Sequence, residues 1–368
     1  MIRALQIAAL ICAFTLSATA WQEGERDYFM LYAMPDLVFK YDIEKDEVVS
    51  TVKTRHGVIH DRTMSHDEKE LFFVTAKQAH VEVLDIAKME FIEDHNFERP
   101  DWIIRVESVR EIPGGTHWYV NVDRIRRKPD RFVIEESEYL HYDRAERETL
   151  KNMKELPSAI RRSASISPDG KNWMVSRNGI TLINPKTLKK IGHVDLSTPR
   201  YTGMGSISLR GDDFFDHKRL PLIRHMYTMR DPVKRNRSLM GLIDINLETF
   251  EVVSLEEWGA ANSMWRLYYT KDRKLGFGTK RGERRSQVDG QDPLTTVVTV
   301  DLSNGRIIRE ARIEHRNGLS FSAISPDGTK LYFSGRGHEF EIYDPEGKHL
   351  KTVELEGEID GRPLLIQE

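Results

Sequence analysis

The stretch Ala323-Ile-Ser-Pro-Asp-Gly328 ends an alternating apolar run in a tight turn, and Leu331-Tyr-Phe-Ser334 follows it directly. Pro presets φ in such a turn and Gly tolerates a positive φ, so this segment predicts two antiparallel strands joined by a short turn. Ser165-Ile-Ser-Pro-Asp-Gly170 repeats the pattern, and Met64-Ser-His-Asp-Glu68, followed by Leu71-Phe-Phe-Val-Thr75, is a degenerate copy. The chain therefore contains an internal repeat built from strands.

A second marker extends the repeat over the whole chain. It is a short apolar strand that ends in Asp or Asn and turns into another strand. We call these residues the anchors, and they are Asp42, Asp85, Asp143, Asn184, Asp244, Asp301 and Asp344. They recur about every 50 residues, close to the roughly 40 to 50 residues of a four-stranded propeller blade. The sequence thus predicts an all-β, seven-bladed β-propeller of four-stranded blades.

The two ends of the chain predict how the ring closes. Before the first turn marker lie only three strand-like runs, Tyr28–Tyr32, Val38–Asp42 and Val48–Val52, and after the last blade one extra run remains, Arg362–Ile366. Three strands plus one complete a blade, so the C-terminal strand is expected to complete the N-terminal blade and leave only short strand edges. Two separate β-sandwich domains are the alternative fold.

The first twenty residues have the pattern of a cleaved secretory signal peptide. Arg3 gives a positive start, Ala4–Leu16 is mostly apolar, and Ala18-Thr19-Ala20 offers small side chains for cleavage. The apolar run is shorter than the roughly 20 residues that a membrane anchor needs, so no membrane insertion is expected. Residues 21–368 then form a single propeller domain in the periplasm. Cys12, the one cysteine, leaves with the signal peptide, which excludes disulfides and cysteine–zinc sites.

The composition is that of a large globular protein. Of 368 residues, 39% are hydrophobic and 31% charged, with a net charge of −3, which excludes an unfolded polyelectrolyte, a coiled coil and a multispan membrane protein. Nucleic acid is not an expected partner, because the chain is exported and has no recognition helix or aromatic-studded basic strand.

Three hydrophilic, basic inserts lengthen the repeat at Asp123–Arg131, Asp216–Ser238 and Lys280–Pro293. We expect each to join the second and third strands of its blade. Because alternate turns of a blade point the same way, all three would rim one face and form a surface for an acidic partner. The docking residues predicted in them are Arg126, Arg127, Lys218, Arg219, Arg235 and Arg284.

The same face would hold the mouth of the central channel. The residues predicted there, as contacts for an anionic ligand or a partner, are His60, Arg62, Trp102, Arg105, Arg162, Trp265, Arg266 and Arg362. The opposing interpretation is structural: arginines on inner strands also pair with acids of neighbouring blades.

No constellation of catalytic residues emerges from the sequence. There is no Gly-x-Ser-x-Gly nucleophile elbow. His56 and His60 are four residues apart, but a metal site needs a third ligand whose position the sequence does not fix. We therefore predict no catalytic, cofactor-binding or metal-binding residue in this chain.

Several stretches resemble one known family across nearly the whole mature chain. They are Arg26-Asp27-Tyr28, Pro35-Asp36, Tyr41-Asp42-Ile43-Glu44-Lys45, Met226–Asp231 leading into Gly241–Thr249, and Ser325-Pro-Asp-Gly328 through Tyr343-Asp344. In order and spacing they resemble the β subunit of quinohemoprotein amine dehydrogenases, a YVTN-like β-propeller.

The resemblance implies a subunit of an enzyme that deaminates primary amines oxidatively. In that family a dihaem cytochrome c subunit and a small subunit bearing a tryptophylquinone carry haem c and the quinone, and the propeller is a non-catalytic scaffold. The absence of a Cys-x-x-Cys-His haem motif agrees with that division. The alternative function is a stand-alone periplasmic propeller that binds or hydrolyses an anionic compound, as lactonase-like enzymes do, with His60, Arg62, Arg105, Arg162 and Arg266.

Overall fold

The computed structural model describes residues 26–112, 115–153, 164–167, 169–176, 179–199, 204–210, 222–234, 236–260, 267–280, 294–315, 319–335, 337–359 and 362–367. The expected signal peptide lies outside these ranges. Within them, no helix is long and apolar enough to cross a membrane.

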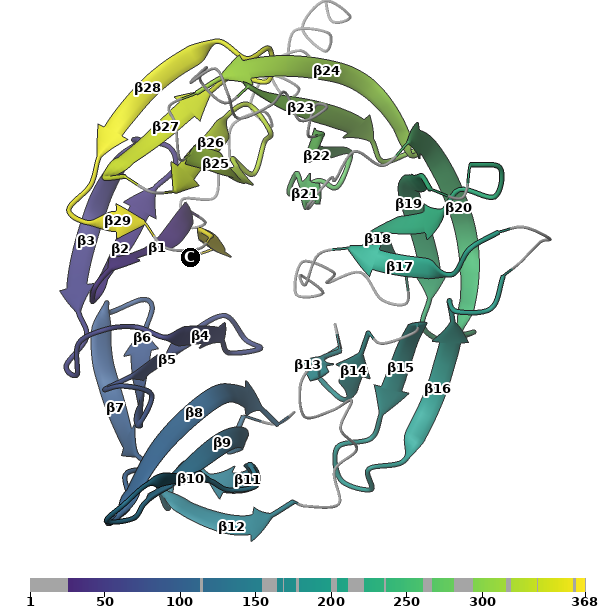
Figure 1. Cartoon of the computed structure of the whole chain (residues 1–368). Coiled ribbons are helices and arrows are strands. Elements are labelled where there is room, and N and C mark those ends of the chain that lie inside the picture. The colour runs from purple at the N-terminus through teal and green to yellow at the C-terminus, as the bar shows by residue number, and fades with distance from the viewer. Residues whose placement is uncertain are drawn as a thin grey trace, which may run out of the picture.

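Antiparallel sheets follow one another around a common axis (Figure 1). Across the described ranges the strands form seven sheets, so the predicted seven-bladed propeller is confirmed. Each blade runs outward from its innermost strand, and the turns between its first and second and its third and fourth strands lie on one face of the ring. We call this the anchor face. The opposite face, the crossover face, carries the second-to-third turns and the connections from blade to blade.

The strands have the following bounds. Blade 1 contains β1 (Asp27–Met34), β2 (Leu37–Asp42), β3 (Glu47–Lys53), β29 (Glu358–Ile359) and β30 (Leu364–Gln367). Blade 2 contains β4 (Asp61–Met64), β5 (Glu70–Thr75), β6 (His80–Asp85) and β7 (Glu90–Asn96). Blade 3 contains β8 (Trp102–Glu111), β9 (His117–Arg127), β10 (Phe132–Ile134), β11 (Glu138–Asp143) and β12 (Glu148–Asn152). Blade 4 contains β13 (Ala164–Ile166), β14 (Trp173–Val175), β15 (Gly179–Ile183) and β16 (Lys190–Asp195). Blade 5 contains β17 (Ile207–Arg210), β18 (Leu222–Arg230), β19 (Ser238–Asn246) and β20 (Glu251–Ala260). Blade 6 contains β21 (Leu267–Tyr269), β22 (Leu275–Lys280), β23 (Leu294–Asp301) and β24 (Arg306–Glu314). Blade 7 contains β25 (Leu319–Ile324), β26 (Leu331–Gly335), β27 (Glu339–Tyr343) and β28 (His349–Glu354).

The two ends of the chain share blade 1, as predicted. β30 pairs with β1 in antiparallel register, with Tyr28 opposite Ile366 and Met30 opposite Leu364. The short strand β29 pairs with the other end of β1. The innermost position of the first blade is thus filled by the last residues of the chain, and this closes the ring.

The hydrophobic core is divided among the blade interfaces. In the described part of the chain, each of seven clusters lies between two neighbouring blades. Between blades 7 and 1, for example, the ring of Phe29 meets that of Tyr332 edge-on at 5.0 Å, and Tyr41 meets Phe340 at 5.3 Å. Because each blade packs mainly on its two neighbours, one ring can exceed the usual size of a single core.

The anchors fix the turn between the third and fourth strands of each blade. A β-bulge interrupts the pairing just before the anchor in all seven described sheets. The anchor side chain then accepts a backbone N–H two to four residues further on. The expected anchor Asp244 is wrong, because it lies inside β19, where its carboxylate accepts a hydrogen bond from Arg224 at 2.6 Å. Asn246 takes the anchor position and accepts the N–H of Glu248 at 2.8 Å.

The turn between the first and second strands also recurs. In Ser325–Gly328 the N–H of Gly328 donates to the carbonyl of Ser325 at 2.9 Å, and the Ser325 hydroxyl donates to Asp327. Both bonds form again at 65–68, 167–170 and 270–273. The copy Thr270-Lys-Asp-Arg273 is harder to recognise in the sequence than Ser65-His-Asp-Glu68, because it replaces Ser with Thr in addition to lacking Pro and Gly.

The second basic insert does not have its expected boundaries. Residues Leu222–Arg230 form β18, the second strand of blade 5, which pairs with β17 and β19. Residues 211–221 therefore join the first strand to the second, and 231–237 join the second to the third. These connections leave opposite ends of the blade, so the insert does not rim one face as a unit. In blade 6, β22 and β23 bound the third insert as predicted, but residues 281–293 lie outside the described ranges.

Candidate functional site

The channel-mouth prediction can be assessed for five of its eight residues. Arg162, Trp265 and Arg266 lie outside the described residues. His60 precedes β4 and is exposed, Arg62 lies on β4, and Arg105 is an exposed residue of β8. Trp102 also lies on β8 and Arg362 precedes β30. The described members therefore come from blades 1, 2 and 3.

Arg62 is engaged in closing the ring. Its guanidinium donates to the carbonyl oxygen of Arg362 at 2.5 Å and stacks 3.6 Å from the ring centroid of Tyr32. The side chain of Arg362 lies 5.8 Å from the ring centroid of Tyr268 in blade 6. These two predicted ligand contacts therefore link blades 1, 2 and 6 through a backbone carbonyl and aromatic rings, rather than through the acids that the structural interpretation expects.

Acidic side chains, which the sequence analysis did not select, lie among these cations. Burial raises the pKa of Asp61 on β4, against the opposing charge of Arg110. Burial and the negative charge of Asp123 also raise the pKa of Glu107, which lies two residues after Arg105. The inner strands of blades 2 and 3 thus carry both signs of charge. Both acids could have been found from the sequence, because Asp61 and Glu107 lie within two residues of the selected arginines.

The first basic insert forms a projection from blade 3. β9 pairs with β11 along its first part and continues through Arg127. Its last residues pair with the short strand β10 instead. We call residues 124–136 the blade 3 projection. Because it leaves the second strand toward the third, it lies on the crossover face as predicted. The predicted docking residues Arg126 and Arg127 are exposed on it.

The blade 3 projection exposes apolar side chains next to its arginines. Phe132 is 67% exposed and Ile134 is 80% exposed. Trp102 lies opposite Arg126 in the β8–β9 ladder, with the guanidinium 5.7 Å from its ring centroid, so this channel-mouth candidate lies alongside the projection. The basic composition of the insert predicts the charges of this surface but not the exposure of its apolar residues.

The remaining docking candidates cannot be placed in the same way. Lys218, Arg219, Arg235 and Arg284 lie outside the described residues. In the described part of the 231–237 connection, Arg237 pairs with the buried Asp231 at 2.6 Å, and Val233 is 84% exposed.

His56 has different neighbours from those the spacing suggested. It lies near His80 and Asp94, in the same connection between β3 and β4 as His60, and its Nε2 is 2.8 Å from the Asp94 carboxylate. Burial raises the pKa of Asp94, but hydrogen bonds with His80 and His56 outweigh this effect and hold that pKa below its usual range. The sequence could not indicate this group because its members come from separate strands and a connection.

Comparison with known proteins supports the fold and no finer assignment. No family model matches the chain, and no curated protein matches it in sequence. Among solved structures it resembles apo AztD from Citrobacter koseri, with 10% identity over 93% of this chain and 98% of that one and a TM-score of 0.52. The dihydro-heme d1 dehydrogenase NirN is 13% identical over 93% of this chain and 75% of that one, with a TM-score of 0.49. A putative 6-phosphogluconolactonase from Bacteroides fragilis NCTC 9343 is 12% identical over 95% and 99%, with a TM-score of 0.45. At these identities the likeness is one of fold alone.

Proposed function

We propose that this chain is the non-catalytic propeller subunit of a periplasmic complex of the quinohemoprotein amine dehydrogenase type. In this role it holds a dihaem cytochrome c subunit and a small quinone-bearing subunit together during the oxidative deamination of primary amines. The observation that carries the proposal is the blade 3 projection, where exposed apolar side chains lie among exposed arginines.

The composition of the projection is that of an interface. Phe132 and Ile134 offer apolar area that water solvates poorly, while Arg126 and Arg127 supply charge around it. Aromatic residues and Arg are enriched at protein–protein interfaces, and apolar residues in the fully buried centre of the patch are surrounded by polar ones. The positive charge favours an acidic partner and speeds its approach.

The contacts of the inner strands favour a scaffold over a substrate pocket. Arg62, the best defined of the predicted ligand contacts, already binds a backbone carbonyl and an aromatic ring. A guanidinium held in this way stabilises the joint between blades, and breaking these contacts to bind an anion would oppose ring closure.

The proposal is tested by isolating the native protein from the periplasm under mild conditions. We expect it to co-purify with a haem-containing polypeptide and a small quinone-staining polypeptide, and the fractions to absorb visible light as c-type cytochromes do. In the double variant Arg126→Glu/Arg127→Glu, we expect the yield of both companions to fall at least about tenfold, since charge reversal makes the patch repel an acidic partner.

A matched control separates docking from general charge effects. Lys186→Glu/Lys189→Glu makes the same change in net charge on exposed residues of the anchor face and should leave the yield of companions unchanged. A colourless monomer that hydrolyses lactones or other anionic substrates would contradict the proposal, as would companions retained in full by the Arg126→Glu/Arg127→Glu variant.

A further inference from the structure

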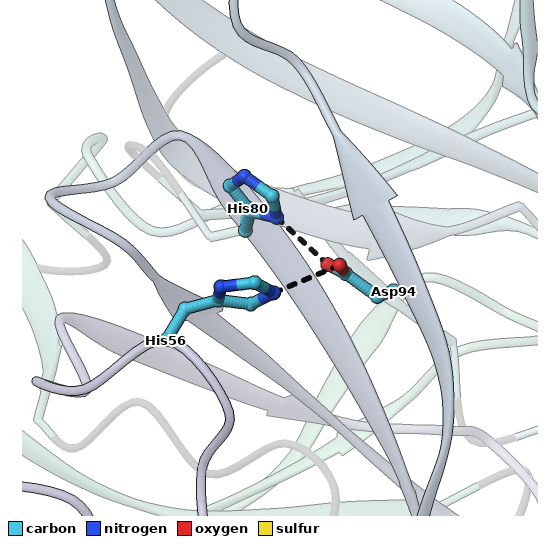
Figure 2. Close-up of side chains that lie close together, drawn as sticks. All are labelled: His56, His80 and Asp94. Carbon is cyan, nitrogen blue, oxygen red and sulfur yellow. Dashed lines mark hydrogen bonds and ion pairs between the residues drawn. The ribbon is translucent and has the colours of Figure 1, made fainter.

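Two imidazoles and a carboxylate meet where blade 1 passes into blade 2 (Figure 2). His56 lies in the connection between β3 and β4, His80 is the first residue of β6, and Asp94 lies near the end of β7. His56 Nε2 is 2.8 Å from Asp94 Oδ2, and His80 Nδ1 is 2.8 Å from Asp94 Oδ1. The ligating atoms of all three lie within 4.8 Å of one another. The strand directions put this group on the crossover face.

A buried carboxylate fixes the connection that carries His56. Glu82, which has no exposed surface, accepts the backbone N–H of Arg55 at 2.7 Å and that of His56 at 3.2 Å. Glu82 also accepts a hydrogen bond from the hydroxyl of Thr75, on β5, at 2.6 Å. Glu82 lies opposite Asp94 in the β6–β7 ladder, so the same two strands position both the support and the ligand. The three side chains are therefore brought together by backbone that is itself held in place.

The turn before His80 is conformationally unusual. Ala76, Lys77 and Gln78 have φ values of 52°, 58° and 70°, three successive residues in the left-handed region. A side chain in this region costs roughly 1 to 2 kcal/mol per residue. The carbonyl of Gln78 accepts the N–H of Val106 in blade 3 at 2.6 Å, which ties the turn to the next blade. This turn therefore fixes the position of His80 at the start of β6.

We propose that His56, His80 and Asp94 bind a divalent transition-metal ion, for which zinc is the expected occupant. Two imidazole nitrogens and one carboxylate oxygen are a donor set that zinc accepts, whereas calcium and magnesium prefer oxygen ligands. Neighbouring ligands around tetrahedral zinc lie about 3.3 Å apart. The two 2.8 Å contacts go to different oxygens of Asp94, so one imidazole must turn toward the oxygen that the other contacts, and the ligating atoms already lie within 4.8 Å of one another. Binding replaces the protons now shared between the imidazoles and the carboxylate.

The partial exposure of the three side chains predicts a metal site that is open to solvent on one side. The side chain of His80 is 10% exposed, while those of Asp94 and His56 are 27% and 32% exposed. Three protein ligands with solvent on one side leave a fourth position for water or an added ligand, in contrast to the four protein ligands of a closed structural site. The ion would join the blade 1–blade 2 connection to two strands of blade 2. The inference is independent of partner docking.

The test is titration of the purified, metal-free full chain with ZnCl2. Calorimetry and competition with a chromophoric chelator should give one equivalent bound with a micromolar or lower Kd, and Co²⁺ in its place should give the visible absorption of a tetrahedral complex. Asp94→Asn keeps the shape of the ligand and removes its charge, and we expect it to weaken binding at least about tenfold. His56→Ala removes a ligand whose side chain is partly exposed, and it should also weaken zinc binding at least about tenfold.

His60→Ala is the matched control, because it removes an exposed imidazole from the same connection and should leave the Kd unchanged. Circular dichroism and thermal unfolding establish that each variant is folded, and zinc should raise the Tm of the parent chain but not that of Asp94→Asn. Failure to bind one equivalent below about 100 µM would overturn the proposal. Equal affinity in the parent chain, Asp94→Asn and His56→Ala would overturn it as well, since the bound ion would then lie elsewhere.

Discussion

Arg144 joins two blades through a pair of carboxylates. Arg144 lies in the turn after β11. Its guanidinium donates to Glu70 at 2.6 and 2.8 Å and to Glu93 twice at 2.8 Å. Both acids belong to blade 2. Burial on its own raises the pKa of Glu93, but hydrogen bonds with His95 and Arg144 outweigh it and lower that pKa to about 2. The carboxylate is thus held in its charged form at the joint between blades 2 and 3.

A pH dependence follows from this lowered pKa. Glu93 stabilises the fold above its unfolded pKa of about 4.3, and this contribution is lost as the pH falls toward about 2. In Glu93→Gln we expect the free energy of unfolding to be lower at pH 6 and to vary less between pH 4.5 and pH 2. Urea unfolding at several pH values measures this. Glu90→Gln, on the same strand but exposed, should keep the parent profile, and an identical profile in Glu93→Gln would refute the expectation.

At the residue scale the sequence predicts turns better than charge partners. Six anchors were identified correctly because the requirement is local: an oxygen at the end of a strand next to free backbone N–H groups. The fifth was misplaced because Asp244 and Asn246 satisfy that requirement equally, and the bulge in β19 decides between them. His80 and Asp94 could not be joined to His56, since only the stacking of strands brings them together.

The turns that follow the anchors share a residue with positive φ, and this residue gives a second prediction. A residue with positive φ follows three or four positions after each anchor, namely Asp46, Met89, Arg147, Leu188, Phe250, Gly305 and Gly347. Glycine relieves a left-handed penalty of roughly 1 to 2 kcal/mol but costs about 0.4 to 1 kcal/mol in unfolded-chain entropy. Arg147 is exposed with φ of 57°, so Arg147→Gly should raise the free energy of unfolding by about 0.5 kcal/mol.

Chemical unfolding measures this gain, and Arg147→Ala is the control. Alanine removes the same long side chain but keeps the Cβ atom that clashes in the left-handed region. It should therefore bring no comparable gain. A stabilisation equal in both variants would show that the charge, and not the backbone, is responsible.

The strand β18 was not predicted, because its composition is basic. β18 was assigned to an insert because it contains Arg224 and Arg230, yet the segment is a strand of the sheet. Arg224 pairs with Asp244 on the next strand and donates to the carbonyl of Leu302 in blade 6, while His225 is buried. A charge that is satisfied across an interface leaves no local signal, so the second insert could not be delimited from the sequence.

For the whole molecule, closure by β30 makes the C-terminus essential. Ile366 is 1% exposed in the core between blades 1 and 2, and removing residues 362–368 deletes it together with the carbonyl that Arg62 binds. We expect the shortened chain to lose several kcal/mol of unfolding free energy and to be cleaved by protease within blade 1. Denaturant unfolding and limited proteolysis measure both effects.

The milder variant Ile366→Ala keeps the β1–β30 pairing and should lose about 2 to 4 kcal/mol, which separates side-chain packing from strand pairing. A shortened chain that unfolds at the parent midpoint would refute the role of closure. Closure by the last strand could be predicted, because counting strand-like runs at both ends requires no knowledge of side-chain contacts, but the short strand β29 was not predicted.

The shared blade also determines the order in which the molecule can be finished during synthesis. Six sheets are made from consecutive residues and can assemble as the polypeptide emerges, but the first one waits for the last residues to be added. Until then β1 presents an open backbone edge, which can pair with a neighbouring nascent chain. A chain shortened within its final residues would therefore be a nearly complete product that is prone to aggregate through its N-terminal strand.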